Sequence, residues 1–125
     1  MSDMLPDLFA PQGGWRVLIH DLSLGAEDNV LEEVGGFHTL MQANSFARRY
    51  VRDSVERCRV PGMTPKEVLE AWFAFGEDAE VADAGESGWR SANELGDFAD
   101  MPSGPEERDW RALDPRRIGE DDEEE

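Results

Sequence analysis

An apolar stripe at helical spacing between residues 39 and 58 constrains the fold of this chain more than any other feature. Thr39 precedes the stripe and Gln42 follows three residues later, the spacing of a capping box that closes the first turn of a helix. Pro61 and Gly62 then end the pattern. Because such a stripe must face a hydrophobic core, it predicts a buried helix of about five turns. Its members are Leu40, Ala43, Phe46, Ala47, Tyr50, Val51, Ser54, Val55 and Cys58.

A second helix is predicted within residues 61–78, PGMTPKEVLEAWFAFGED. Thr64 suits the N-cap, Pro65 the first helical position and Glu67 the third, so this start is again a capping box. Gly76 stands where a left-handed residue ends many helices. The apolar side chains of this helix spread over more than one face, which predicts burial on two sides or an exposed patch. They are Leu69, Trp72, Phe73 and Phe75.

Segments with the pattern of β-strands precede and follow these helices in the sequence. Residues 14–22, GWRVLIHDL, alternate apolar and polar side chains, and residues 30–37, VLEEVGGF, form a weaker strand with Gly35-Gly36 as its end or as a bulge. An acidic loop with Glu27 and Asp28 joins them, so a hairpin is the simplest prediction. A short third strand around Ala79–Ala82 would support a hairpin that is marginal alone.

The remaining segments divide the chain. Ser91 and Glu94 repeat the capping-box spacing and predict a short third helix. We predict a flexible arm over residues 1–14, one small α+β domain over residues 15–101, and a disordered acidic tail over residues 102–125 that ends in Glu120–Glu125. The predicted fold is a β-hairpin packed against two to three helices. A domain of this size has a marginal core, which the arm, a second copy of the chain or a partner would complete.

Charge limits the partners. The net charge of −17 and the pI near 4.3 disfavour direct binding to nucleic acid or to an anionic membrane surface, and favour a protein with a basic surface. One cysteine excludes an internal disulfide, and the first residues lack the pattern of a signal peptide. We therefore expect a cytoplasmic protein without a membrane span.

The chain resembles a small bacterial family of uncharacterised proteins. The resemblance rests on GGFHTLMQANSFARRYV and above all on Pro61–Thr64 with Phe75–Asp78, a PGMT and FGED signature around the second helix. It covers about half to two-thirds of the chain, and the acidic extension after Met101 departs from it. It implies a compact α+β fold in a bacterial cytoplasm, and it assigns no activity, cofactor or functional residue.

No pattern favours catalysis. Cys58 lies on the apolar stripe, which favours an inert buried thiol over a nucleophile. His20 and His38 would need to meet beside a carboxylate to hold a metal, and no ligand spacing supports that arrangement. We predict no enzyme, no cofactor and no metal, with a small metal-dependent enzyme using the two histidines as the weakest alternative.

Three groups of residues make up the candidate interaction surface: arginines of the first predicted helix, an acidic pair after the second, and aromatic side chains of the second helix and of the tail. The first helix has a local excess of arginines, interpreted either as a solvated face with pairs such as Arg49–Asp53 or as a docking stripe for an acidic ligand or for the chain's own tail. Glu77 and Asp78 either accept hydrogen bonds from backbone amides in a turn or bind a cation or a basic partner. The candidates are Arg48, Arg49, Arg52, Trp72, Phe75, Glu77, Asp78 and Trp110.

The function that these observations favour is a non-enzymatic protein-interaction or regulatory module, with the acidic tail modulating the contact. The alternative is an acidic inhibitor that mimics nucleic acid and acts on a basic nucleic-acid-binding protein.

Overall fold

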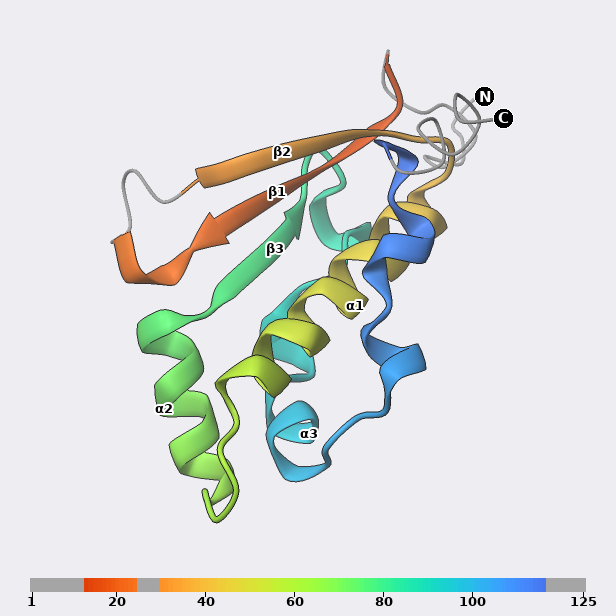
Figure 1. Cartoon of the computed structure of the whole chain (residues 1–125). Helices are drawn as coiled ribbons and strands as arrows, with labels where there is room; N and C mark the ends of the chain where they lie inside the picture. The colour runs from red at the N-terminus through yellow and green to blue at the C-terminus, as the bar shows by residue number, and fades with distance from the viewer. Residues whose placement is uncertain (1–12, 25–29, 117–125) are drawn as a thin grey trace.

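The computed structural model of the chain describes residues 13–24 and 30–116. It is an α+β fold in which helices cover one face of a three-stranded antiparallel sheet (Figure 1), as the sequence predicts. The strands are β1 (Trp15–Asp21), β2 (Val30–Phe37) and β3 (Glu77–Val81), in the order β2-β1-β3. The helices are α1 (Leu40–Cys58), α2 (Pro65–Phe75) and α3 (Leu95–Asp100). Most of the predicted arm, the acidic loop with Glu27 and Asp28, and the run Glu120–Glu125 lie outside the described residues.

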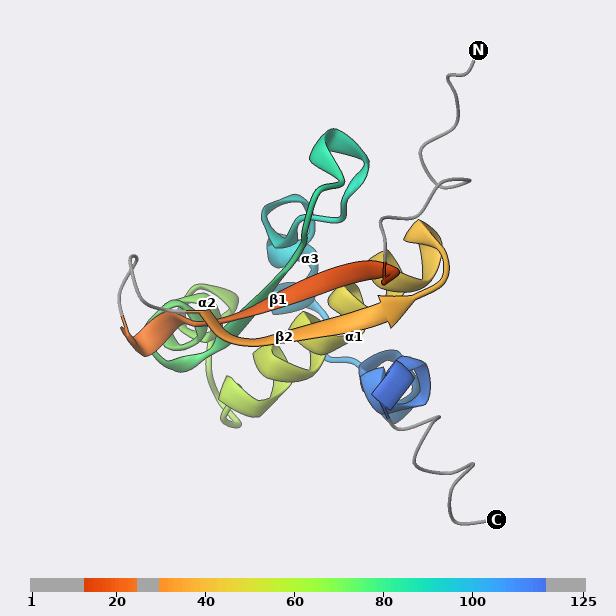
Figure 2. The ribbon, with the colours of Figure 1, turned by 90° about the horizontal axis from the view of Figure 1, so that it is seen from above.

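The central strand β1 follows the predicted alternation, since Trp15, Val17 and Ile19 are buried against the helices. Figure 2 looks onto the opposite face of the sheet, with α1 behind it. Trp15 pairs with Phe37 and Val17 pairs with Val34, so β2 has one more residue than β1 between these two pairs. The extra residue is a bulge at the predicted pair of glycines, which bends the end of β2 toward the start of α1.

Both helices begin as predicted. The Thr39 hydroxyl accepts from the Gln42 amide at 3.1 Å, and the Gln42 side chain accepts from the Thr39 amide at 3.3 Å. The same reciprocal pair joins Thr64 and Glu67 at the start of α2. Because a capping box involves neighbours in sequence only, it forms independently of the rest of the fold. No helix among the described residues is long and apolar enough to cross a membrane.

The prediction of a left-handed residue at Gly76 was wrong. Gly76 has φ −88° and ψ −170°, which is extended backbone that leads directly into β3. A Cβ at this position would lie 2.3 Å from Cδ1 of Trp72 and 2.8 Å from its Nε1. Glycine is needed here because the indole ring passes against the backbone.

The predicted capping box between Ser91 and Glu94 was also wrong, although the third helix is present. Ser91–Asn93 form a 3-10 turn, and α3 begins after Glu94 without a side-chain cap. The Glu94 carboxylate instead accepts from Arg48 Nε at 2.9 Å and from Trp89 Nε1 at 2.7 Å. A charged donor outcompetes a backbone amide for a carboxylate, so the local pattern is overridden.

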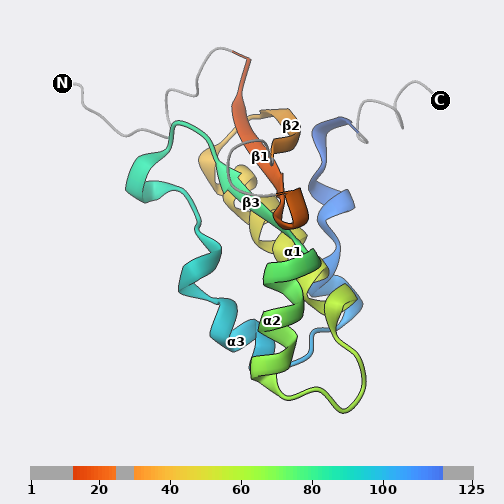
Figure 3. The ribbon, with the colours of Figure 1, turned by 90° about the vertical axis from the view of Figure 1, so that its left-hand side faces the viewer.

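Residues 105–113, which we name the C-terminal strap, correct the prediction of a disordered tail from residue 102 onward. They form two 3-10 turns, Pro105–Arg108 and Trp110–Leu113, and both turns contact α1. In Figure 3 the strap runs along one side of α1 and the segment with α3 runs along the other. The composition of this stretch is too polar to build its own core, but α1 offers partners for its arginine and tryptophan side chains.

Candidate interaction surface

The structure distributes the eight predicted surface residues over three places. One group lies where α1 meets the strap or the region of α3, and it consists of Arg48, Arg49, Arg52 and Trp110. A second group lies where α1 and α2 meet, and it consists of Trp72, Phe75 and Glu77. Asp78 lies apart from both groups and faces the 3-10 turn at Ser91–Asn93.

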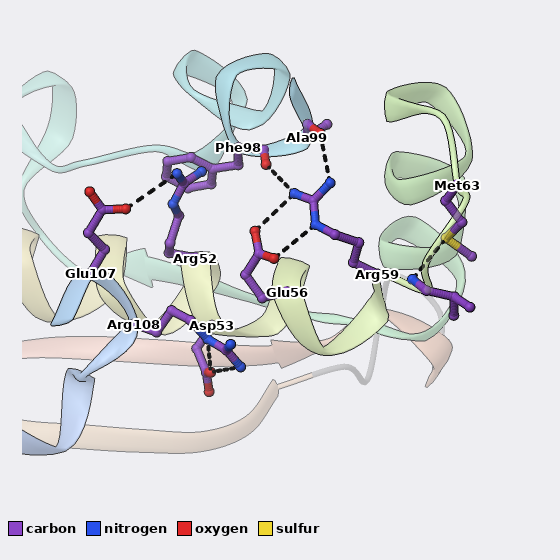
Figure 4. A network of polar contacts seen from close by, with 10 residues as sticks. Arg52, Asp53, Glu56, Arg59, Met63, Phe98, Ala99, Glu107 and Arg108 are labelled. Atoms are coloured by element: carbon purple, nitrogen blue, oxygen red, sulfur yellow. Dashed lines mark hydrogen bonds and ion pairs between the residues drawn. The ribbon is translucent and has the colours of Figure 1, made fainter. Parts of the chain in front are cut away.

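The arginine stripe of α1 is used inside the molecule. Arg48 pairs with Glu94, and Arg49 donates to the backbone carbonyl of Asp109 at 3.0 Å. Arg52 is 7% exposed, and its guanidinium carbon lies 4.5 Å from the centre of the Phe98 ring. Figure 4 shows the two side chains side by side. The stripe therefore contacts nearby parts of the same chain. Docking of an acidic ligand on it stays a prediction, and the run Glu120–Glu125 lies outside the described residues.

The predicted pairing of Arg49 with Asp53 is replaced by other contacts. Asp53 pairs with Arg57 at 3.3 Å on its own helix and with Arg108 of the strap at 2.8 Å. Arg59, at the end of α1, donates to the carbonyl groups of Phe98 and Ala99 at 2.8 and 3.0 Å (Figure 4). This arginine satisfies the free carbonyls at the end of α3.

Trp72 is a core residue and not a surface residue. Its side chain is 1% exposed, and its Nε1 donates to Ser54 Oγ at 3.1 Å. The same hydroxyl accepts from the Glu77 amide at 2.9 Å. One buried oxygen on α1 thus fixes both α2 and the start of β3, which sets the distance between the two helices at this end.

Phe75 lies exposed beside an open hollow at this end of the helices. Its side chain is 76% exposed, whereas Trp72, three residues earlier, is buried. The hollow has a volume of about 350 Å³. We call it the α1–α2 groove, and it is lined by Ser54, Arg57, Cys58, Ala71, Phe75, Gly76 and Glu77.

The polar groups of the groove are held by residues beneath it. The Tyr50 hydroxyl donates to Glu77 at 2.5 Å, and burial together with this carboxylate raises the pKa of Tyr50. Burial also raises the pKa of the Cys58 thiol, against a smaller opposing effect of Arg57. A raised pKa keeps Cys58 protonated at neutral pH, so the groove disfavours the thiolate that a nucleophile requires.

Asp78 lines a second hollow, of about 380 Å³, between residues of β3 and the segment 89–92. Burial raises the pKa of its carboxyl group, although hydrogen bonds from Ser91 and from the Ala79 amide act in the opposite direction. His20 lines the same hollow and contacts Glu80 at 3.0 Å. This arrangement matches the prediction that the carboxylate accepts bonds from the adjacent backbone.

The two histidines lie at opposite ends of the hairpin. His20 pairs with Val30, while His38 follows Phe37, which pairs with Trp15. Among residues 13–24 and 30–116, no group of three or more His, Cys, Asp or Glu side chains is placed to hold a metal ion. The arrangement that a metal enzyme based on His20 and His38 would need is therefore not formed by the described residues.

Relative to the wild type, the Asp78→Asn variant should gain stability progressively as the pH rises from about 3 to 7. Because its pKa is raised in the native state, the contribution of Asp78 to stability is full below its unfolded-state pKa and is lost as the pH rises through the native value. Asparagine does not titrate and can still accept from the Ala79 amide. Urea unfolding of both proteins at several pH values measures the trend.

A substitution at Asp21 should give the opposite change of stability with pH. The hydroxyl and the amide of Ser23 donate to Asp21 and lower its pKa, so Asp21→Asn should lose stability relative to the wild type as the pH rises. If the two variants show the same pH trend, burial is not what distinguishes Asp78.

Sequence reasoning identified Phe75 and Glu77 but missed the groove between them. Ala71 and Phe75 are four residues apart and share one flank of α2, which is a readable signal. The facing residues Arg57 and Cys58 come from α1, and only the packing of the two helices brings them opposite.

Comparisons of the chain with protein-family models, with curated proteins and with solved structures found no match. The resemblance to the family with the PGMT and FGED signature therefore stays a prediction.

Proposed function

We propose that the protein is a non-enzymatic interaction module that binds another protein through the α1–α2 groove, with the acidic C-terminal residues modulating the contact. The observation on which the proposal rests is the exposed Phe75 ring beside an open hollow that has a buried, hydrogen-bonded floor. Burying an exposed phenylalanine contributes on the order of 2 kcal/mol to association. A rigid floor lets a partner use that energy without ordering the site first.

The proposed partner presents an apolar side chain surrounded by basic residues. Arg48 and Arg57 of α1 pair with carboxylates of the same chain, so they add little positive potential to the surface of a chain with a net charge of −17. Such a charge accelerates association with a basic protein and opposes association with a second copy of the chain. The apolar contact at Phe75 would then supply the part of the affinity that persists in salt.

The alternative function, mimicry of nucleic acid by an acidic inhibitor, is favoured by the same net charge. It differs from the first proposal in that the contact would spread over carboxylates rather than centre on Phe75. Mimicry predicts binding that is lost in high salt and that does not depend on the groove.

Site-specific cross-linking separates the two functions. A photoreactive phenylalanine analogue is placed in the full-length protein at Phe75 or, as a matched control, at Met41, which is 74% exposed on the first turn of α1. We expect an adduct with a discrete protein from position 75 and none from position 41. The adduct should form also in about 1 M salt, where the Debye length is about 3 Å.

The control at Met41 and the salt dependence show which of the two functions the result supports. Equal adducts from both positions would mean non-specific contact, and the absence of an adduct at position 75 would contradict docking in the groove. Partners that co-purify independently of a Phe75→Ala substitution and dissociate in about 1 M salt would favour mimicry instead.

A further inference from the structure

The strap grips α1 through one carboxylate and one aromatic pair. Arg108 donates to Asp53 with Nε at 2.9 Å, and its Nη2 lies 2.8 Å from the same oxygen. Trp110 donates to the other oxygen of Asp53 at 3.2 Å, and its ring centre lies 4.9 Å from that of Tyr50. Two strap residues therefore converge on Asp53 and Tyr50, which are neighbours on one side of α1.

The same two α1 residues hold two lining residues of the α1–α2 groove. Asp53 also pairs with Arg57, at 3.3 Å, and the Tyr50 hydroxyl donates to Glu77 at 2.5 Å. Arg57 and Glu77 both line the groove. Asp53 and Tyr50 each contact the strap on one side and a lining residue of the groove on the other.

The strap is built to dock loosely. Neither of its two 3-10 turns contains a buried residue, although Trp110 and Leu113 pack partly against the core. Beside it, the Nε and Nη1 atoms of the buried Arg52 have no hydrogen-bond partner among residues 13–24 and 30–116, and Glu107 of the strap lies 3.5 Å from Nη2. Buried donors left unpaired reduce the stability that docking brings, which is typical of an element that opens locally while the rest stays folded.

We infer that the strap and the α1–α2 groove are coupled, so that docking of the strap on Asp53 and Tyr50 keeps Arg57 and Glu77 in place at the groove, and release of the strap loosens them. For its role in regulation, this inference rests on the proposed function of the groove. A partner that binds the ordered groove would then stabilise the docked strap, and the strap would raise the affinity for that partner, because coupling between two sites is reciprocal.

The single cysteine of the chain offers a reporter that needs no partner. Cys58 lines the groove and is half-buried, so its rate of reaction with 5,5′-dithiobis(2-nitrobenzoic acid) measures how often loosening of the surrounding residues exposes the thiol fully. In the full-length protein, Arg108→Ala removes a strap contact that is distant from Cys58 in the chain. We expect the rate to rise roughly tenfold, the effect of losing one charge-assisted contact on an opening equilibrium.

Arg16→Ala is the matched control. Arg16 also makes two carboxylate contacts, with Glu33 at 2.8 Å and Asp83 at 2.5 Å, but it lies on the opposite face of the sheet. Its substitution should change the rate at Cys58 by less than about twofold. Equal rates for Arg108→Ala and Arg16→Ala would overturn the inference.

The urea dependence of the rate excludes a trivial explanation. If Arg108→Ala acts through local opening, the labelling rate at low urea should depend only weakly on urea, whereas global unfolding shows the full denaturant dependence. A rise with the full dependence would overturn the coupling. Failure of cross-linking at Phe75 would contradict the proposed function and leave the Cys58 result intact, so the two failures are distinguishable.

Discussion

Gly76→Ala is expected to lower the free energy of unfolding by about 3 kcal/mol, the upper part of the range for overpacking in a core. The new Cβ would lie 2.3 Å from Cδ1 of Trp72 and 2.8 Å from its backbone oxygen. The indole cannot move away, because it is 1% exposed and its Nε1 is bound to Ser54. Urea unfolding, followed by circular dichroism, measures the loss.

Gly104→Ala is the control for this substitution. Gly104 precedes the strap and has φ −83°. Among the residues that the structure describes, and apart from its two chain neighbours, no atom lies within 4 Å of the position of a Cβ there. Its replacement should change the stability by no more than about 0.5 kcal/mol. A Gly76→Ala variant as stable as Gly104→Ala would show that the end of α2 is not packed as described.

Ser54→Ala is expected to cost about 2 to 3 kcal/mol, which is large for the removal of one oxygen atom. The hydroxyl accepts from Trp72 Nε1 at 3.1 Å and from the Glu77 amide at 2.9 Å. Because Ser54 is 3% exposed and Trp72 is 1% exposed, water cannot readily replace the lost acceptor. An unpaired buried donor costs roughly 1 to 3 kcal/mol. Chemical unfolding of the variant tests the value.

Ser45→Ala provides the comparison on the same helix. Ser45 is only partly buried, and alanine has a helix propensity higher than serine by about 0.5 kcal/mol. We expect no loss of stability for Ser45→Ala, so the difference between the two serine variants isolates the buried hydroxyl. If Ser54→Ala is also neutral, the connection of α1 to α2 and β3 through this oxygen contributes nothing measurable.

Both substitutions also bear on the groove, because Ser54 and Gly76 line it. A stability loss at either position should come with faster labelling of Cys58, since the floor and the wall of the groove share these residues. The strap acts on the same groove from the other side of α1, through Asp53 and Tyr50. The groove thus joins the packing of the core to the exposed Phe75, and Asp53 and Tyr50 connect it to the docked strap.

The amino-acid sequence by itself determined the regular elements and their facing. The starts of α1 and α2 were predictable because a capping box joins residues three apart, and the buried side of β1 was predictable because strand side chains alternate. The α+β class and the third strand follow from the same local patterns. Phe75 was found as a surplus aromatic on a helix too apolar for one buried face.

Only the tertiary structure decided which of these residues meet. Trp72 and Phe75 have the same apolar character in the sequence, yet one is buried on Ser54 and the other is exposed. The strap has too few apolar residues to predict order, and it is held by Asp53, which lies 55 residues before Arg108. The Glu94 carboxylate binds Arg48, which is 46 residues away, instead of forming the predicted capping box. Local patterns specify conformations within one or two turns, whereas charge pairs and close packing between distant segments depend on the whole chain being folded.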